Sequence, residues 1–182
     1  PPRSTRKESS AASDVYKRQM QVSKVEIDDL SIIRVINDEA IPAVNSVSVE
    51  EFVWFHKNSI YFKKVSLDES LAGFLLVLPM NIPYKSLNYT WFSKRYDNFA
   101  YIDRIAVKEE FKGSGIGTLL YTDLEKSLPK EIKMIACEYN IKPLNMISKN
   151  FHQKMAYKNV GTQLTENNTK QVSLMVKEIN DR

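Results

Sequence analysis

The sequence predicts an α/β domain with a mixed, mostly antiparallel sheet of six to seven strands flanked by helices. Short β-branched and aromatic runs alternate along the chain with patterns of helical period. Residues 71–78 form a continuous apolar run of strand length, far shorter than the roughly 20 residues that span a bilayer. A glycine-rich turn at 112–117 joins a strand pattern to a helix pattern. Residues 20–182 are therefore expected to form one domain.

A short first strand at 21–27 and two helices are expected near the start of this domain. Asp28 or Asp29 can cap a helix that runs to about residue 40. The apolar stripe of this helix would consist of Leu30, Ile33, Val35 and Ile36. Ser48, followed three residues later by Glu51, resembles a capping box and predicts a second helix over 49–57.

The remaining elements follow in a regular order. They are a strand pair at 59–65 and 71–78, a long connection at 81–98, a strand at 99–107, a helix ending near 128, a strand at 132–139, a helix at 143–155, and two strands at 157–163 and 171–179. The polar turn within the first pair predicts an antiparallel hairpin. The long connection is too aromatic for a disordered linker, and long loops in compact domains are usually functional.

Residues 1–19 require separate treatment because they lack any helical or strand period. They also lack the apolar region of a signal peptide. Their two ends resemble an in-frame translation of a transposon-based sequencing adaptor. We therefore expect residues 1–19 to be non-native and disordered, with Met20 at or near the native start. A genuine basic tail is the alternative.

Composition and charge narrow the function classes. The segment 1–19 holds five basic and two acidic residues, which leaves 21 basic and 20 acidic residues in the rest of the chain. The sequence pI near 9.0 therefore does not indicate nucleic-acid binding. Cys137 is the only cysteine, which excludes an intramolecular disulfide and suits a reducing, cytoplasmic location. No membrane association is expected.

The glycine-rich turn is the most informative segment. Gly113, Gly115 and Gly117 precede a helix pattern, so the turn would expose backbone N–H groups where the helix dipole favours negative charge. Lys112 adds a positive charge. The predicted ligand is a phosphate or pyrophosphate. A glycine-rich helix entry without a ligand is the alternative.

Three kinds of phosphate-binding loop compete for this turn. A Walker A loop needs a lysine before its Ser or Thr, whereas Gly117 is followed directly by Thr118. A dinucleotide-binding fingerprint needs a different glycine spacing. The third is the Gln/Arg-x-x-Gly-x-Gly/Ala signature of the GNAT acetyltransferases. The segment from Lys112 to Gly117 resembles it, with lysine in place of Gln or Arg.

A second motif extends this resemblance. A GNAT strand–helix–strand unit commonly reads Asn-x-x-Ala-x-x-Phe/Leu-Tyr, and its four positions are occupied here by Asn145, Ser148, Phe151 and His152. The two motifs have the expected order and separation. Over about residues 99–161 the chain thus resembles GNAT superfamily N-acetyltransferases, in particular a branch with unassigned acceptors. The resemblance implies the GNAT fold, with a splayed central strand pair.

The resemblance also implies acetyl-CoA as the cofactor, bound in a V-shaped opening between the central strands. Backbone groups of 105–107 would bind pantetheine and polarise the thioester, and the amides of 112–117 would bind the pyrophosphate. The cofactor-binding residues implied are Ile105, Ala106, Val107, Lys112, Gly113, Ser114, Gly115, Ile116, Gly117, Thr118, Asn145, Ser148 and Phe151.

The implied reaction is direct attack of an amine, which needs a base for the ammonium and an acid for the CoA thiolate. The usual acid of the family is a tyrosine where this chain has His152. An imidazole could protonate the thiolate, or it could only hydrogen-bond to the cofactor or pack at the helix end. Asp103 and Glu138 are the candidate bases, on the two strands that flank the opening. Asp103 could instead pair with Arg104, and a remote base acting through water stays open.

Strand alternation is expected to place Tyr101, Asp103, Ile105 and Val107 on one face. The aromatic side chains expected to wall the acceptor pocket are Trp54, Tyr84, Tyr89, Trp91 and Tyr101, with a core role as the alternative. The acceptor is expected to be a small-molecule or peptide amine. A homodimer stays open, since many relatives dimerise. Two histidines without nearby Cys or carboxylate spacing give no metal motif.

Two rival functions stay open at this level. A non-catalytic acyl-CoA-binding or sensory module on the same fold is suggested by the missing tyrosine. A nucleotide-phosphate protein would use the same glycine turn, although the absent Walker lysine disfavours it.

Overall fold

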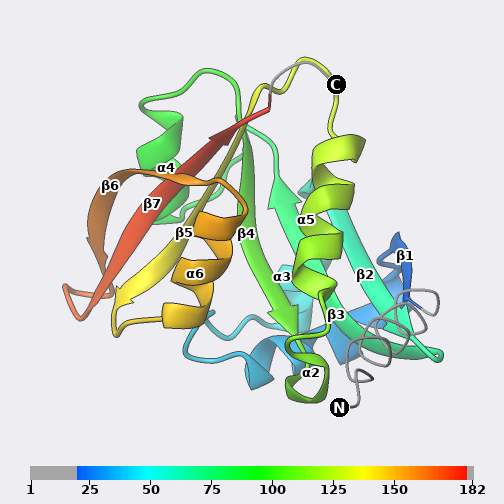
Figure 1. The fold of residues 1–182 in the computed structure, drawn as a ribbon. Coiled ribbons are helices and arrows are strands. Elements are labelled where there is room, and N and C mark those ends of the chain that lie inside the picture. The colour runs from blue at the N-terminus through cyan, green and yellow to red at the C-terminus, as the bar shows by residue number, and fades with distance from the viewer. Residues whose placement is uncertain (1–19, 180–182) are drawn as a thin grey trace, which may run out of the picture.

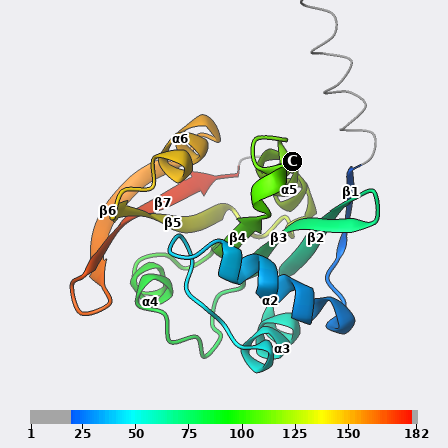
Figure 2. The ribbon, with the colours of Figure 1, turned by 90° about the horizontal axis from the view of Figure 1, so that it is seen from below.

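A seven-stranded sheet forms the centre of the molecule, with helices on both of its faces (Figure 1 and Figure 2). The computed structural model describes residues 20–179. The strands are β1 (Met20–Lys24), β2 (Tyr61–Leu67), β3 (Ser70–Leu78), β4 (Ala100–Val107), β5 (Met134–Lys142), β6 (Lys158–Thr165) and β7 (Lys170–Glu178). Their order across the sheet is β1-β2-β3-β4-β5-β7-β6. Only β4 and β5 run parallel, which confirms the mixed, mostly antiparallel sheet.

The helices divide between the two faces. They are η1 (Ile27–Asp29), α2 (Leu30–Glu39), α3 (Val49–Asn58), α4 (Leu87–Ser93), η2 (Glu109–Phe111), α5 (Ile116–Ser127) and α6 (Met146–Lys154). Figure 2 shows α2, α3 and α4 on one face and α5 and α6 on the other. One apolar cluster lies under each set, the first built around Phe52 and Phe74 and the second around Leu120 and Leu124. None of the described helices is long and apolar enough to cross a lipid bilayer.

Local signals explain how several helices begin. The Ser48 hydroxyl accepts a hydrogen bond from the Glu51 N–H at 3.1 Å, and the Glu51 carboxylate accepts one from the Ser48 N–H at 2.8 Å. The predicted capping box is therefore confirmed. Asn145 caps α6 in the same manner, because its side-chain oxygen accepts from the Ser148 N–H at 2.9 Å. This cap starts α6 at Met146, three residues later than predicted.

The predicted apolar stripe of α2 is wrong at one position. Leu30, Ile33 and Ile36 are buried as predicted, but Val35 is 52% exposed, because it lies off the stripe that these residues share. Asn37 is buried instead.

The long connection at 81–98 contains a helix that the sequence analysis did not predict, α4, whose cap is Ser86. With seven residues, this helix is too short to show a helical period in the sequence.

The central strands part soon after they meet. β4 and β5 pair only at Ala100 with Ile135 and at Tyr101 with Ala136. Beyond these residues, β4 continues against β3 to Val107 and β5 continues against β7. The facing edges of β4 and β5 therefore lack strand partners over the rest of their length, which confirms the splayed central pair.

A β-bulge lies in β4 at the start of this splay. Leu76 of β3 pairs with Arg104, whereas the next residue, Val77, pairs with Ile102, so Asp103 is the extra residue. The predicted single face for Tyr101, Asp103, Ile105 and Val107 is therefore wrong. Tyr101 packs into the cluster under α2, α3 and α4, while Ile105 and Val107 pack into the cluster under α5. One inserted residue reverses the alternation of the side chains.

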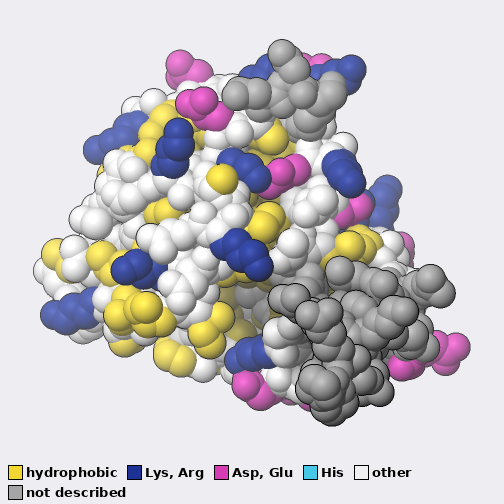
Figure 3. Space-filling view, viewed as in Figure 1, with side chains coloured by type: hydrophobic (Ala, Val, Ile, Leu, Met, Phe, Trp, Pro, Cys, Tyr) yellow, Lys and Arg dark blue, Asp and Glu magenta, His cyan; other side chains and the backbone are white. Residues whose placement is uncertain are grey.

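The face that carries α5 and α6 has no broad area of one charge over its described residues (Figure 3). Exposed apolar side chains gather near the beginning of α6, where Leu144, Met146 and Ile147 lie. The segment 1–19, expected to be non-native, lies outside the described residues.

Candidate active site

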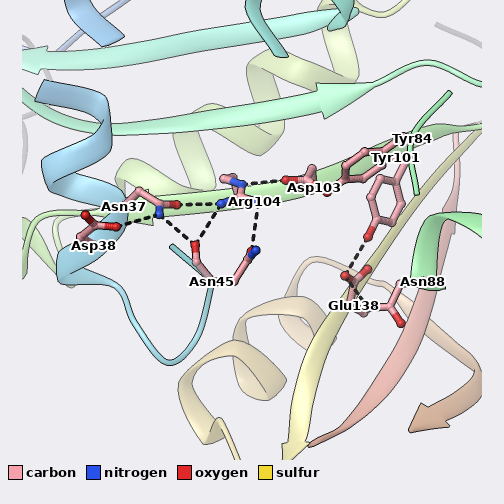
Figure 4. Close-up of polar contacts among 9 residues, drawn as sticks. All are labelled: Asn37, Asp38, Asn45, Tyr84, Asn88, Tyr101, Asp103, Arg104 and Glu138. Carbon is pink, nitrogen blue, oxygen red and sulfur yellow. Dashed lines mark hydrogen bonds and ion pairs between the residues drawn. The ribbon is translucent and has the colours of Figure 1, made fainter. Parts of the chain in front are cut away.

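Two carboxylates flank the splay, one on each diverging strand (Figure 4). Glu138 of β5 accepts hydrogen bonds at one oxygen, Oε1, from the Tyr101 hydroxyl at 2.7 Å and from the Asn88 side-chain amide at 2.9 Å. Tyr101 lies on β4 and Asn88 on α4. Three separate elements therefore meet at this carboxylate.

The second oxygen of Glu138, Oε2, is buried and has no hydrogen-bond partner among the described residues. Burial is the main cause that raises the pKa of Glu138, to about 7, against the opposing effect of the Tyr101 and Asn88 hydrogen bonds. The negative charge of Asp103 raises the pKa further. Near neutral pH, this group can therefore both accept and release a proton.

Asp103 has opposite surroundings, because both of its oxygens are bonded. The Nε atom of Arg104 donates to Oδ2 at 2.6 Å, and the Tyr84 hydroxyl donates to Oδ1 at 2.5 Å. The Arg104 and Asp103 side chains are only 3% and 4% exposed. Asp103 is therefore held in a buried, satisfied ion pair, which is the alternative that the sequence left open.

Arg104 extends this pair to the helical layer, as Figure 4 shows. Its Nη1 atom donates to the side-chain oxygen of Asn37 at 3.0 Å and to the carbonyl of Asn45 at 3.2 Å, and its Nη2 atom donates to the Asn45 side-chain oxygen at 3.2 Å. Asn37 belongs to α2, and Asn45 to the loop between α2 and α3. One buried guanidinium thus fastens that loop to the bulge in β4.

The predicted acceptor-pocket aromatics divide into two groups. Tyr84 packs against Trp54 at 6.0 Å and Tyr89 at 5.6 Å between ring centroids, and Tyr89 lies 5.4 Å from Tyr101. These four rings form one connected cluster, in which Tyr84 bonds to Asp103 and Tyr101 bonds to Glu138. Trp91 lies apart, against Gly161 of β6.

His152 lies on the opposite face of the sheet, within the contact between α5 and α6. It is 3% exposed. Its Nδ1 atom lies 2.7 Å from the Ser148 carbonyl, so Nδ1 carries the proton and donates. Its Nε2 atom, 3.0 Å from the Tyr121 hydroxyl, then accepts. Burial lowers the pKa of His152, although its bond to Ser148 opposes this, and the ring is expected to be neutral.

The glycine turn has the backbone of an anion site. Gly113 and Gly115 have φ angles of +78° and +93°, which side-chain-bearing residues rarely adopt. The first N–H bond of α5 runs from Leu119 to the Gly115 carbonyl. No described residue accepts a hydrogen bond from the N–H groups of residues 115–118. These donors therefore point to an anionic ligand at the start of α5.

Comparison with known proteins agrees with this geometry. The model of the Acetyltransferase (GNAT) family matches residues 30–157. This chain belongs to the GNAT family. A comparison with curated protein sequences gives no match.

Solved structures share the fold of this GNAT domain at low sequence identity. Ard1 from Thermoplasma volcanium superposes with a TM-score of 0.71 at 13% identity, covering 90% of this chain and 99% of that one. NAA60 from Arabidopsis thaliana, in complex with a bisubstrate analogue, gives 0.69 at 18% identity, covering 88% and 98%. The ribosomal-protein-S18-alanine N-acetyltransferase from Escherichia coli gives 0.68 at 15% identity, covering 90% and 96%.

The GNAT family transfers acetyl groups from acetyl-CoA, which is therefore the cofactor of this domain. The residues of the candidate site fit acetyl-CoA. The free N–H groups at the start of α5 suit the pyrophosphate, and the unpaired edge of β4 at Ile105, Ala106 and Val107 suits the amide-bearing pantetheine. Phe151 of α6 packs against Gly117, where an added Cβ would lie 3.3 Å from the ring, so α5 and α6 touch here.

Other predicted cofactor residues of the GNAT domain have partners within the chain. Lys112 pairs with Glu109, and Ser114 donates its hydroxyl to the Phe111 carbonyl at 2.5 Å. Asn145 and Ser148 both take part in the first turn of α6, through the cap described above.

Sequence reasoning missed Asn88 and the wider role of Arg104. Asn88 lies 50 residues before Glu138, and no motif connects them. The Ser86 cap could have placed Asn88 on a helix, but only the fold brings that helix to β5.

Proposed function

We propose that this GNAT domain transfers the acetyl group of acetyl-CoA to an amine acceptor by direct attack, with Glu138 as the general base. The observation that carries the proposal is the Oε2 atom of Glu138, buried and unpartnered beside the splay of β4 and β5. A carboxylate with a pKa of about 7 suits removal of a proton from an ammonium at neutral pH.

The neighbouring side chains suit this role. Tyr101 and Asn88 hold Oε1, which leaves Oε2 as the proton-accepting atom. The Trp54, Tyr84 and Tyr89 rings pack beside Tyr101, and they would offer apolar and cation–π contacts to an approaching ammonium.

In this proposal Asp103 positions other groups and does not act as the base. Its two oxygens are occupied by Arg104 and Tyr84, and a proton taken up there would weaken a buried ion pair. Asp103 instead holds Tyr84 in the aromatic wall and keeps a negative charge near Glu138, which helps to raise the pKa of that group.

The acceptor class proposed is a small-molecule or peptide amine. NAA60 with its bisubstrate analogue and the ribosomal-protein-S18-alanine N-acetyltransferase share the fold, and the second of these is named for a protein acceptor. We place the reaction in the cytoplasm, where the buried thiol of Cys137 would stay reduced.

The test is acetyl transfer from acetyl-CoA to a panel of small amines, amino acids and peptides, followed by thiol release and mass spectrometry. Glu138→Gln is expected to reduce kcat/KM by about 100-fold or more. It should also remove the acidic limb of the pH–rate profile near pH 7, which the pKa of Glu138 predicts. Glu131→Gln, on an exposed glutamate, is the matched control and should behave as the wild type.

Two results would contradict the proposal. Tight acetyl-CoA binding with no acetylated amine would favour the non-catalytic acyl-CoA-binding module. A Glu138→Gln variant with the wild-type rate and pH profile would move the base to another residue.

A further inference from the structure

Two amide side chains in series connect the far edge of the sheet to the proposed base. Gln163 lies on β6, the last strand of the sheet, and its Nε2 atom donates to the Asn88 side-chain oxygen at 2.9 Å. The Nδ2 atom of Asn88 in turn donates to Oε1 of Glu138 at 2.9 Å. These two hydrogen bonds link β6 to β5 through α4.

The direction of the two bonds matches the ionised state of Glu138. An ionised carboxylate only accepts hydrogen bonds, whereas an amide has one acceptor oxygen and one donor NH2 group. When Glu138 is ionised, Asn88 must therefore direct its NH2 group at the carboxylate, which turns its oxygen toward β6. Among the described residues, Gln163 is the donor that satisfies this oxygen. The observed arrangement is thus the one that suits a carboxylate ready to accept a proton.

The reversed arrangement would suit a different state of Glu138. If the Asn88 amide turned over, its oxygen would face Oε1, and only a proton on Oε1 would make that contact a hydrogen bond. The NH2 group of Asn88 would then need an acceptor at position 163. Reversal would therefore hold a proton on the oxygen that the proposed reaction does not use.

Close packing fixes the place of residue 163 beside α4. Gln163 pairs with Val172 of β7, whose side chain belongs to the cluster under α2, α3 and α4, so Gln163 lies on this face too. Gly161, two residues earlier on the same face, packs against Trp91 of α4. The contact between Gln163 and Asn88 is therefore supported on both sides by the fold.

We propose that Gln163 is a positioning residue for Glu138, because the donor at position 163 keeps the NH2 group of Asn88 directed at the carboxylate. This inference rests on the proposed function of Glu138 as the general base. Gln163 acts only through Asn88, since Oε1 of Glu138 accepts from Tyr101 and Asn88 and Oε2 has no partner among the described residues.

The charge balance at Glu138 makes this role measurable. Burial raises the pKa of Glu138, and the hydrogen bonds from Tyr101 and Asn88 oppose that effect. The titratable and charged side chains that act on Glu138 from the surrounding elements are Tyr84, Tyr101, Asp103, Arg104, Tyr121 and Cys137. None of the hydrogen bonds among the described residues joins Gln163 to any of them. A change at position 163 therefore reaches Glu138 through Asn88 or through its own charge.

Gln163→Glu tests the proposal, because it replaces the donor NH2 group by an acceptor of the same shape. The Asn88 amide should reverse, and the pKa of Glu138 should rise by about one to two units, the size of a hydrogen bond to a charged group. Carbon-13 NMR titration of the glutamate carboxyl groups measures this shift, with the Glu138 signal identified by its absence from Glu138→Gln.

The same variant should change the pH–rate profile. Because the acidic limb near pH 7 would move upward with the pKa of Glu138, kcat/KM should fall by about 5- to 50-fold at pH 7 and recover at higher pH. Gln163→Lys offers only donors, so it should not raise the pKa of Glu138.

Two controls separate the amide from the added charge. Gln171→Glu places the same charge on β7 of the same hairpin. Gln171 pairs with Leu164, on the face of the sheet opposite Gln163, so the acidic limb should stay in place. Gln163→Glu in an Asn88→Leu background keeps the charge without the amide, and there the pKa of Glu138 should rise by less than about half a unit.

An equal pKa shift with and without Asn88 would overturn the proposal, because the added charge alone would then explain it. A rate for Gln163→Glu that falls equally at every pH, with the pKa of Glu138 unchanged, would also overturn it and indicate a purely structural role. Failure of the proposed function has a separate signature. The NMR shift would then appear although the wild type acetylates no amine.

Discussion

Glu138 and Asp103 show how two carboxylates on facing strands acquire different properties. Asp103 is surrounded by donors at both oxygens. Glu138 has donors at one oxygen only, and burial of the other favours its protonated form. The difference leaves Asp103 tied to its two donors, whereas Glu138 titrates near neutral pH.

The raised pKa of Glu138 predicts a pH-dependent stability. Between its unfolded pKa of about 4.5 and its folded pKa of about 7, the folded chain holds the proton more tightly, so stability falls as pH rises. Glu138→Gln removes this loss. The unfolding free energy of the variant, relative to that of the wild type, should therefore increase by on the order of 2 kcal/mol from about pH 4.5 to about pH 8. Urea unfolding at the two pH values measures it, and a pH-independent difference would contradict the raised pKa.

Arg104 predicts a second effect at the residue scale. Arg104→Gln leaves Asp103 buried without its cation, which is expected to cost about 3–5 kcal/mol of unfolding free energy. The double variant with Asp103→Asn should recover part of this loss. Arg34→Gln breaks an ion pair with Asp38 in which the Arg34 side chain is 52% exposed. This change should lower the unfolding free energy by less than about 1 kcal/mol. Equal losses in the two arginine variants would show that Asp103 does not depend on Arg104.

Among the elements, α5 depends most on backbone conformation. Its N-cap residue, Gly115, has a φ of +93°, and an added Cβ would meet nothing within 4 Å. The glycine is therefore required for its backbone angle and not for space. The N–H groups that follow it are oriented by this angle.

Gly115→Ala should destabilise the fold by about 1–2 kcal/mol and weaken CoA binding, because an L side chain disfavours this φ. Gly115→Asn should lose less, since asparagine tolerates left-handed backbone better than alanine. Calorimetric Kd values for CoA and denaturant unfolding measure both effects. If alanine were tolerated as well as asparagine, backbone strain at Gly115 would not govern the site.

Across the whole molecule, the α4 helix connects the far edge of the sheet to the site. Gln163 of β6 donates to the Asn88 side chain at 2.9 Å, and Asn88 donates to Glu138. Beside this chain of bonds, Trp91 of α4 packs on Gly161 of β6. The position of the proposed base therefore depends on how α4 packs against β6.

Gly161→Ala tests this packing. The new Cβ would lie 2.9 Å from the Trp91 ring, so the ring must move, at a cost of about 1–3 kcal/mol. In a Trp91→Leu background the same change should cost much less, and the double-mutant cycle measures the coupling. An additive result would mean that the Trp91 ring and Gly161 do not pack against each other.

The sequence by itself determined the order of the elements apart from α4, the capped helix start at Ser48, and the glycine turn with its family motif. These features depend on residues within a few positions of one another. Propensity, capping and glycine conformation act over that range, so a sequence can be read for them directly.

Only the tertiary structure decided how the site is assembled. The bulge at Asp103 arises from the register of β4 against β3, and it reverses the faces expected for Tyr101 and Ile105. The contact of Asn88 with Glu138 requires α4 to lie over the splay. Strand register and the burial of polar groups depend on partners far away in the chain. No local sequence pattern predicts where those partners lie.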